Sequence, residues 1–208
     1  MSEYKNHHTI QPPFHCPTFP HKETSKGIQI NQNALPLLPP PPPVHALLEA
    51  LTTPNTPQST LLSTFTTSPS PLAHEHGLPQ LAPFLGRPFT GQEGLKTYFD
   101  LLSTHLSIET MTFEPDADWV VDESCMAVSL RGKATFVWKE TGQGWDETFV
   151  YRIRVAEECS GSEGQGQGTL KVCEYRVWAD TGAAYLARIG GLKGLLGEGG
   201  EDVDLGFG

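Results

Sequence analysis

The hydrophobic period of this chain changes once, near residue 106, and this change constrains the fold more than any other feature. Before it, apolar residues recur three and four positions apart, as in Leu95, Tyr98 and Phe99, which is the spacing of a helix. After it, Val, Phe, Trp and Tyr alternate with polar residues, which is the spacing of strands. Helices followed by a run of strands indicate an α+β domain, in which a curved antiparallel sheet carries helices on one face.

Three helices are expected before the switch. The first covers residues 44–51, the second follows the pair Thr56 and Pro57, and the third begins at a T-x-x-E capping box made of Thr90 and Glu93. Strands are expected near residues 72–76, 108–114, 117–122, 124–140, 145–157 and 168–180.

The two ends of the chain differ from its middle. Residues 1–43 hold a five-proline run and show neither a helical nor a strand period, and residues 189–208 are rich in glycine and acidic side chains. Such segments cannot bury enough apolar surface to offset the entropy lost on ordering. We therefore expect a disordered proline-rich arm over 1–43, one folded domain over 44–188, and a flexible acidic tail over 189–208.

Charge and cysteine content exclude several classes of protein. The net charge of −10 argues against a nucleic-acid partner, which needs a clustered basic surface. No apolar run is long enough to span a membrane and the start lacks a signal pattern, so we expect no membrane association and a cytoplasmic protein, with the nucleus as the alternative. The cysteines lack C-x-x-C spacing, so no zinc is expected, and Cys125 and Cys173 are interpreted as small core residues.

Several phrases of the sequence resemble the NTF2-like superfamily in its SnoaL-like branch. They are "LLSTFTT", "HEHG", "FLGRPFTGQEGLKTYFDLL" and the final strand "LKVCEYRVWAD", and the resemblance covers roughly residues 44–188. It implies a cone in which a curved sheet wraps about three N-terminal helices and encloses a pocket. It also implies that a homodimer forms through the outer face of the sheet.

Strand alternation suggests which side chains would line such a pocket. Along 124–140 the apolar parity includes Phe136 and Trp138, and along 145–157 it includes Tyr151. Phe99, on the apolar stripe of the third helix, is added to this set. We expect a pocket for a small apolar molecule.

The last expected strand leaves two arrangements open. If Cys173, Tyr175 and Val177 face the core, then Glu174 and Arg176 are ordinary charges on the outer face. If the other parity faces inward, Glu174, Arg176, Trp178 and Asp180 form a polar patch inside the cavity. Under the second arrangement, the predicted pocket also includes Arg176 and Trp178.

The resemblance also implies acid–base chemistry without a cofactor. His76 is the candidate general acid or base, Asp180 or Glu174 the carboxylate that orients it, and Tyr151 a hydrogen-bond donor. His74 and His76 lie on one side of their short strand with Glu75 on the other, a spacing that does not suit a metal.

Two functions therefore stay open. One is a cofactor-free isomerase, dehydratase or cyclase that acts on a small apolar substrate. The other is a non-catalytic module that binds a ligand or a protein and uses the proline-rich arm for docking.

Overall fold

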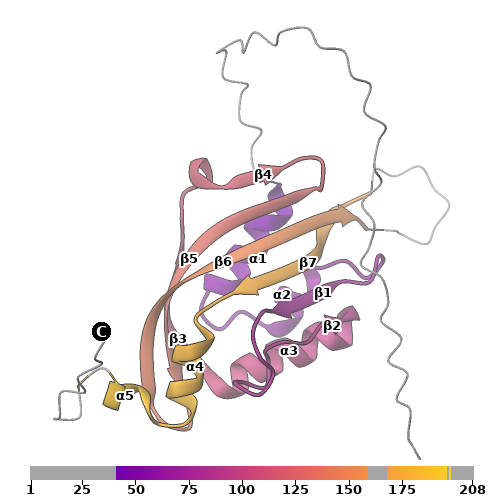
Figure 1. Cartoon of the computed structure of the whole chain (residues 1–208). Helices are drawn as coiled ribbons and strands as arrows, with labels where there is room; N and C mark the ends of the chain where they lie inside the picture. Colours follow the sequence, from indigo (N-terminus) through magenta and orange to yellow (C-terminus); the bar gives the residue numbers. More distant parts are fainter. Residues whose placement is uncertain (1–40, 159–167, 196, 198–208) are drawn as a thin grey trace, which may run out of the picture. The chain divides into compact units, whose positions relative to one another are not determined.

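The computed structural model describes residues 41–158, 168–195 and 197 (Figure 1). Of the predicted disordered arm, 1–43, residues 1–40 lie outside this described part. Of the predicted tail, 189–208, residue 196 and residues 198–208 lie outside it. Within the described part the elements are, in order, α1 (Pro42–Thr52), α2 (Gln58–Ser63), β1 (Leu72–Glu75), β2 (Phe89–Thr90), α3 (Gly91–His105), β3 (Leu106–Phe113), a 3-10 turn (Asp116–Asp118), β4 (Val120–Asp122), β5 (Ala127–Trp138), β6 (Gln143–Glu157), β7 (Leu170–Trp178), α4 (Thr181–Arg188) and α5 (Leu192–Leu195).

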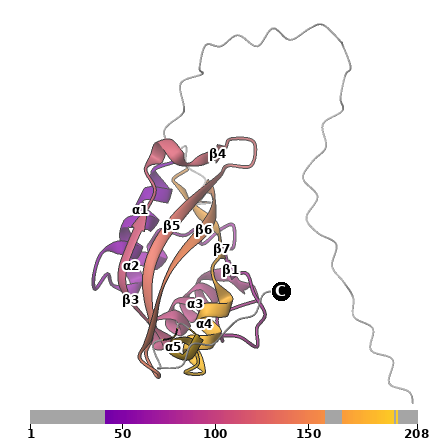
Figure 2. The ribbon, with the colours of Figure 1, turned by 60° about the vertical axis from the view of Figure 1, so that its left-hand side comes forward.

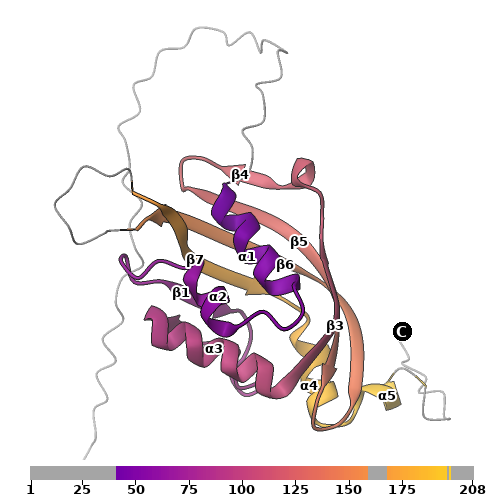
Figure 3. The same cartoon turned by 180° about the vertical axis from the view of Figure 1, so that it is seen from behind.

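The first three helices lie on one side of the sheet (Figure 3). In α1, Pro42 occupies the first turn, where a missing N–H is harmless, and the apolar stripe buries Val44, Leu47 and Leu48. The longer helix α3 buries a matching stripe that includes Leu95. Both helices are amphipathic, and burial of their apolar faces against the sheet holds this layer in place.

The sheet is open, curved and mixed. Its strands follow the order β2-β1-β7-β6-β5-β3, with β4 also paired to β5, and the long strands β5 and β6 bend along their length (Figure 2). All neighbours are antiparallel except β1 and β7, which run parallel. The expected antiparallel sheet is therefore corrected at this pair. Because β1 and β7 are far apart in sequence and no hairpin joins them, their connection does not impose an antiparallel pairing.

Alternation along β5 and β6 gives the sheet two faces. The inner face, toward α1 to α3, buries Leu130 from β5 and Phe149 and Ile153 from β6, each at most 2 % exposed. The outer face carries the polar residues between them. Gly132 is required on the inner face, because a Cβ there would lie 2.3 Å from the ring of Phe149.

The last strand contains a bulge that the sequence pattern does not show. Arg154 of β6 pairs with Glu174, but the next residue, Val155, pairs with Val172, so Cys173 is an extra residue in β7. Val172 and Tyr175, which have opposite parity, are consequently both buried in the core. Neither of the two unbroken alternations considered for this strand describes it.

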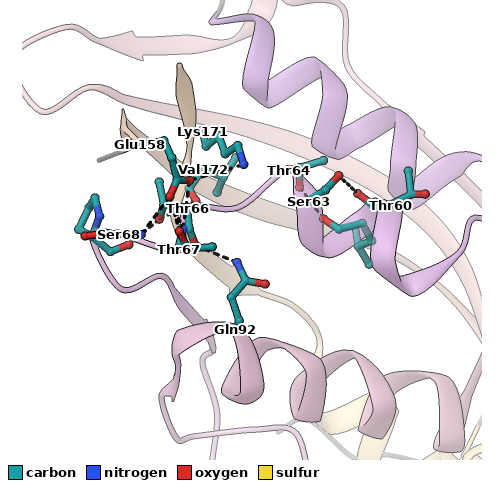
Figure 4. A network of polar contacts seen from close by, with 12 residues as sticks. Thr60, Ser63, Thr64, Thr66, Thr67, Ser68, Gln92, Glu158, Lys171 and Val172 are labelled. Atoms are coloured by element: carbon teal, nitrogen blue, oxygen red, sulfur yellow. Dashed lines mark hydrogen bonds and ion pairs between the residues drawn. The ribbon is translucent and has the colours of Figure 1, made fainter. Parts of the chain in front are cut away.

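A polar network fixes the approach of the chain to β1 (Figure 4). The backbone N–H of Thr66 donates to the carbonyl of Val172 at 2.9 Å, and Gln92 Nε2 donates to the carbonyl of Thr66 at 2.8 Å. Glu158 Oε1 accepts from the backbone N–H of Thr67 at 2.9 Å. These contacts tie the segment between α2 and β1 to α3, to β7 and to Glu158, the residue that follows β6.

Three local expectations need adjustment. Thr90 is the N-cap of α3, but its side chain makes no capping hydrogen bond. Cys125 and Cys173 are partly exposed rather than core residues, while Cys16 and Cys159 lie outside the described residues. The strand expected to reach residue 180 ends at Trp178, because Asp180 instead serves as the N-cap of α4. None of the helices among the described residues is long and apolar enough to cross a membrane.

Candidate functional site

A cavity of about 560 Å³ lies between the inner face of the sheet and the helices. That volume is in the range of pockets that enclose small organic molecules. Aromatic side chains form much of its wall, with Phe99 from α3 and Phe136, Trp145 and Phe149 from β5 and β6. The apolar wall makes any carboxyl group inside the cavity costly to ionise.

Glu75 is such a carboxyl group. It is the last residue of β1, and its side chain is 7 % exposed and lines the cavity. Tyr98 Oη donates a hydrogen bond to Glu75 Oε2 at 2.7 Å. Burial raises the pKa of Glu75 to about 8, with the charge of Glu147 adding to the rise and the bond from Tyr98 opposing it. At neutral pH the carboxyl is therefore mostly protonated, and it can exchange a proton in the physiological range.

Three buried tyrosines surround this carboxyl group. Tyr98, Tyr151 and Tyr175 are each at most 4 % exposed and all line the cavity. The ring centroids of Tyr151 and Tyr175 lie 4.9 Å apart. Burial raises the pKa of each phenol well above its usual value, so all three remain neutral hydrogen-bond donors.

Glu147 supplies a second carboxyl group from β6. Its Oε2 accepts a hydrogen bond from Trp145 Nε1 at 2.8 Å and from the backbone N–H of Asp180 at 3.3 Å. Burial raises the pKa of Glu147, and although these two bonds lower it, the nearby charge of Asp180 raises it further. Among the described residues, Glu147 Oε1 accepts no hydrogen bond, which leaves that oxygen available to a ligand.

Four of the residues predicted from the sequence line this cavity: Tyr151, Asp180, Phe136 and Phe99. Asp180 Oδ1 is occupied as the cap of α4, where it accepts the backbone N–H groups of Gly182 and Ala183 at 3.0 Å each. Trp138 is fully buried and stacks on His105, but it is not part of the cavity wall.

The other predicted residues lie on the outer face. Glu174, Arg176 and Trp178 point away from the cavity, because the parity of β7 after its bulge directs Tyr175 and Val177 inward. The arrangement with a polar patch inside the cavity is therefore not the one observed.

His76 belongs to this outer group. Its ring stacks on Trp178 and on His74, with centroids 4.3 Å apart in each pair. Burial and the positive charge of Arg176 lower the pKa of His76, so it is neutral at pH 7. It does not converge with Asp180, and an acid–base role for His76 would require a substrate on the outer face.

Sequence reasoning missed Glu75, Tyr98, Glu147 and Tyr175. The sequence did contain a signal for the two carboxyl groups. Glu147 lies on the same strand face as Trp145 and Phe149, and a carboxyl group on such an apolar face is unusual unless that face borders a cavity. Glu75 shows the same pattern beside the buried Ala73. No group of three or more His, Cys, Asp or Glu residues in the described part is arranged to hold a metal ion.

The fold and the cavity together define a class of small α+β proteins in which a curved sheet wraps a pocket. The fold is that of the NTF2-like proteins, among whose solved structures are ketosteroid isomerase-like and SnoaL-like members. A putative isomerase from Rhodopseudomonas palustris is similar over 71 % of this chain and 93 % of its own, with a TM-score of 0.50 and 13 % identity.

Two further structures are similar at lower scores. An NTF2-like protein from Burkholderia xenovorans has a TM-score of 0.48 and 20 % identity over 70 % of this chain and 92 % of its own. PrhC from Penicillium brasilianum has a TM-score of 0.49 and 15 % identity over 74 % of this chain and 91 % of its own. No protein-family model matches the sequence, and no curated protein shows significant similarity to it. At these identities the comparison establishes the fold only.

Proposed function

We propose that this protein binds a small, largely apolar molecule in the cavity and catalyses a proton shift on it without a cofactor. The observation that carries the proposal is Glu75, a buried carboxyl group that lines an aromatic cavity, is hydrogen-bonded to Tyr98 and has a pKa of about 8. A carboxyl group with a pKa near the working pH is suited to general acid–base catalysis.

The two carboxyl groups divide the task. Protonated Glu75 donates its proton to a polar atom of the substrate, such as a carbonyl oxygen, while Tyr98 holds the carboxyl in place. Glu147, in its carboxylate form, accepts a proton from a neighbouring carbon through the free Oε1. One proton leaves the substrate and one enters, so the net reaction is an isomerisation. A dehydration or a cyclisation uses the same two groups.

The test is exchange of α-protons for deuterium in a panel of apolar cyclic ketones, followed by NMR in D2O. We expect the protein to accelerate exchange, and Glu75→Gln to lower the rate by about 100-fold, the usual contribution of a general acid or base. Asp146→Asn is the matched control, because it makes the same acid-to-amide replacement at the exposed neighbour of Glu147 on β6. We expect this variant to keep the rate.

Two results would count against catalysis. If the protein exchanges no ketone of the panel faster than buffer, or if Glu75→Gln is as active as the parent, then the acid–base role is wrong. Should ligands still bind in the cavity, the non-catalytic binding module is the better description.

A further inference from the structure

Within the part of the chain that the structure describes, the two carboxyl groups of the cavity, Glu75 and Glu147, have no positive partner. Ion pairs occur elsewhere in the described part, for example between Lys96 and Asp100 at 2.7 Å and between Arg131 and Glu114 at 2.7 Å. Glu75 and Glu147 form none. A carboxyl group removed from water normally has a cation beside it. Glu75 is buried and Glu147 is partly buried, so a cavity that contains both and no cation from the described residues lacks their electrostatic complement.

The other charged groups around the cavity do not supply that complement. Among the described residues of the cavity wall, Lys139 is the one basic residue, and it is exposed, with its Nζ bonded to the carbonyl of Ser103. Asp180, at the start of α4, adds a further negative charge near Glu147. An anionic ligand would therefore meet mainly carboxyl groups inside the cavity.

The aromatic wall is favourable to a cation as well. The ring centroids of Phe136 and Trp145 lie 5.6 Å apart, and those of Phe149 and Tyr151 lie 4.6 Å apart. Trp145 also donates its indole N–H to Glu147, so this ring and the carboxyl group border the same part of the cavity. Aromatic faces attract organic cations, most strongly where water is excluded.

We infer that the ligand of this cavity is an organic cation, an apolar molecule with a tertiary or quaternary amine, whose charged end lies between Glu75, Glu147 and the aromatic wall. This inference rests on the ligand-binding part of the proposed function and does not require catalysis. It narrows the ligand class from apolar molecules in general to amphiphilic amines.

Binding of such a cation must be coupled to proton release. The titratable groups of the described residues that act on Glu75 are Tyr98 from α3, Tyr151 and Glu147 from β6, and Tyr175 from β7, and none of them is positively charged. A bound cation therefore stabilises the carboxylate of Glu75, whose proton passes to the buffer. The affinity for the cation should rise as the pH rises toward about 8 and then level off.

The test uses benzyltrimethylammonium and neopentylbenzene, which have the same shape but differ in charge. Isothermal titration calorimetry in two buffers of different ionisation enthalpy measures affinity and counts released protons. We expect the cation to bind about tenfold tighter than the neutral compound above pH 8, and to gain at least about tenfold in affinity between pH 6 and pH 9. Close to one proton should be released per bound cation near pH 6.

Variants assign the effect to the cavity. Glu75→Gln should abolish the proton release and lower the affinity for benzyltrimethylammonium by about tenfold, while the affinity for neopentylbenzene stays the same. Asp146→Asn, which removes a charge from the exposed side of the same sheet, should leave both affinities unchanged. The proton count on the parent protein is informative even if Glu75→Gln fails to fold.

The possible failures are distinguishable. If both compounds bind equally well and no proton is released, the inference about the cation is wrong and the proposed function stands. If neither compound binds while ketone exchange depends on Glu75, the inference of a cationic ligand is again wrong and the proposed catalysis stands. If neither binds and no ketone is exchanged, both proposals are overturned.

Discussion

Glu75 and Glu174 lie on the paired strands β1 and β7, on opposite faces of the same sheet, and their surroundings give them opposite properties. The carboxyl group of Glu75, on the inner face, accepts one hydrogen bond from the described residues, and its donor is Tyr98. Glu174, on the outer face, accepts from Arg176 Nε at 2.7 Å, with Arg152 and Arg154 at 3.3 and 3.4 Å. Burial raises the pKa of both carboxyl groups, but at Glu174 the bond from Arg176 and the charges of the three arginines outweigh it.

The difference shows that burial alone does not decide the charge of a carboxyl group. Where cations are within reach, the buried group stays ionised and links strands, as Glu174 does. Where none is within reach, the group holds its proton until the pH approaches 8, as Glu75 does. The first arrangement serves the fold, and the second provides a group that can react or bind a cation.

The strongest test of this contrast is the stability of Glu75→Gln. The folded-state pKa of Glu75, about 8, lies above its ordinary value of 4.5, so its contribution to stability is complete below pH 4.5 and is lost as the pH rises to about 8. Glutamine does not titrate, so the variant does not lose stability in this way as the pH rises. We therefore expect the variant to be more stable than the parent near pH 7 by about 3 kcal/mol. Urea unfolding between pH 4.5 and 9 measures the gap, and a gap that does not grow with pH would contradict the raised pKa.

Glu174→Gln should behave in the opposite way. The folded-state pKa of Glu174 lies below 4.5, so its stabilisation is present above pH 4.5 and is lost as the pH falls through the lowered pKa. We expect the variant to be less stable than the parent near pH 7 by about 2 kcal/mol, because three arginines lose their shared carboxylate. The same urea experiment should show the difference shrinking in acid. A constant difference across pH would mean that packing, and not charge, is responsible.

Tyr98→Phe sharpens the description of the inner face. The phenol lowers the pKa of Glu75 through its hydrogen bond, so its removal should raise that pKa further and reduce stability by about 1 kcal/mol. A carbon-13 NMR titration of the glutamate carboxyl groups measures the shift. Tyr185→Phe, on α4, is the control and should leave the titration of Glu75 unchanged. An unchanged pKa in Tyr98→Phe would show that the bond does not form in solution.

Trp178→Ala is the mildest change and tests the outer face. Trp178 is 42 % exposed and stacks on His76, so its loss should alter stability by only about 0.5 kcal/mol. If the predicted homodimer forms through this face, the variant should dissociate at concentrations where the parent is a dimer. Analytical ultracentrifugation of both proteins decides this, and equal association would exclude Trp178 from the interface.

The sequence predicted the parts of the site that depend on local alternation. Tyr151 and Phe136 lie on the cavity wall because β5 and β6 alternate without interruption where they face it. The prediction for β7 could not be made in the same way, since one extra residue, Cys173, reverses the parity halfway along the strand. The alternation also predicted correctly that His76 and Glu75 lie on opposite sides of their strand. Nothing in the local sequence indicates which of the two sides faces the helices.

The chain's own pattern thus determined its class of fold, because the periods of helix and strand are set by local geometry and by which residues can be buried. It also determined the two faces of the long hairpin of β5 and β6, whose pairing follows from adjacency. Only the tertiary structure decided the parallel pairing of β1 with β7, the cavity between sheet and helices, and the protonation of Glu75. These depend on contacts between residues far apart in sequence and on how completely the fold removes the carboxyl group of Glu75 from water and from the cationic side chains of the described residues.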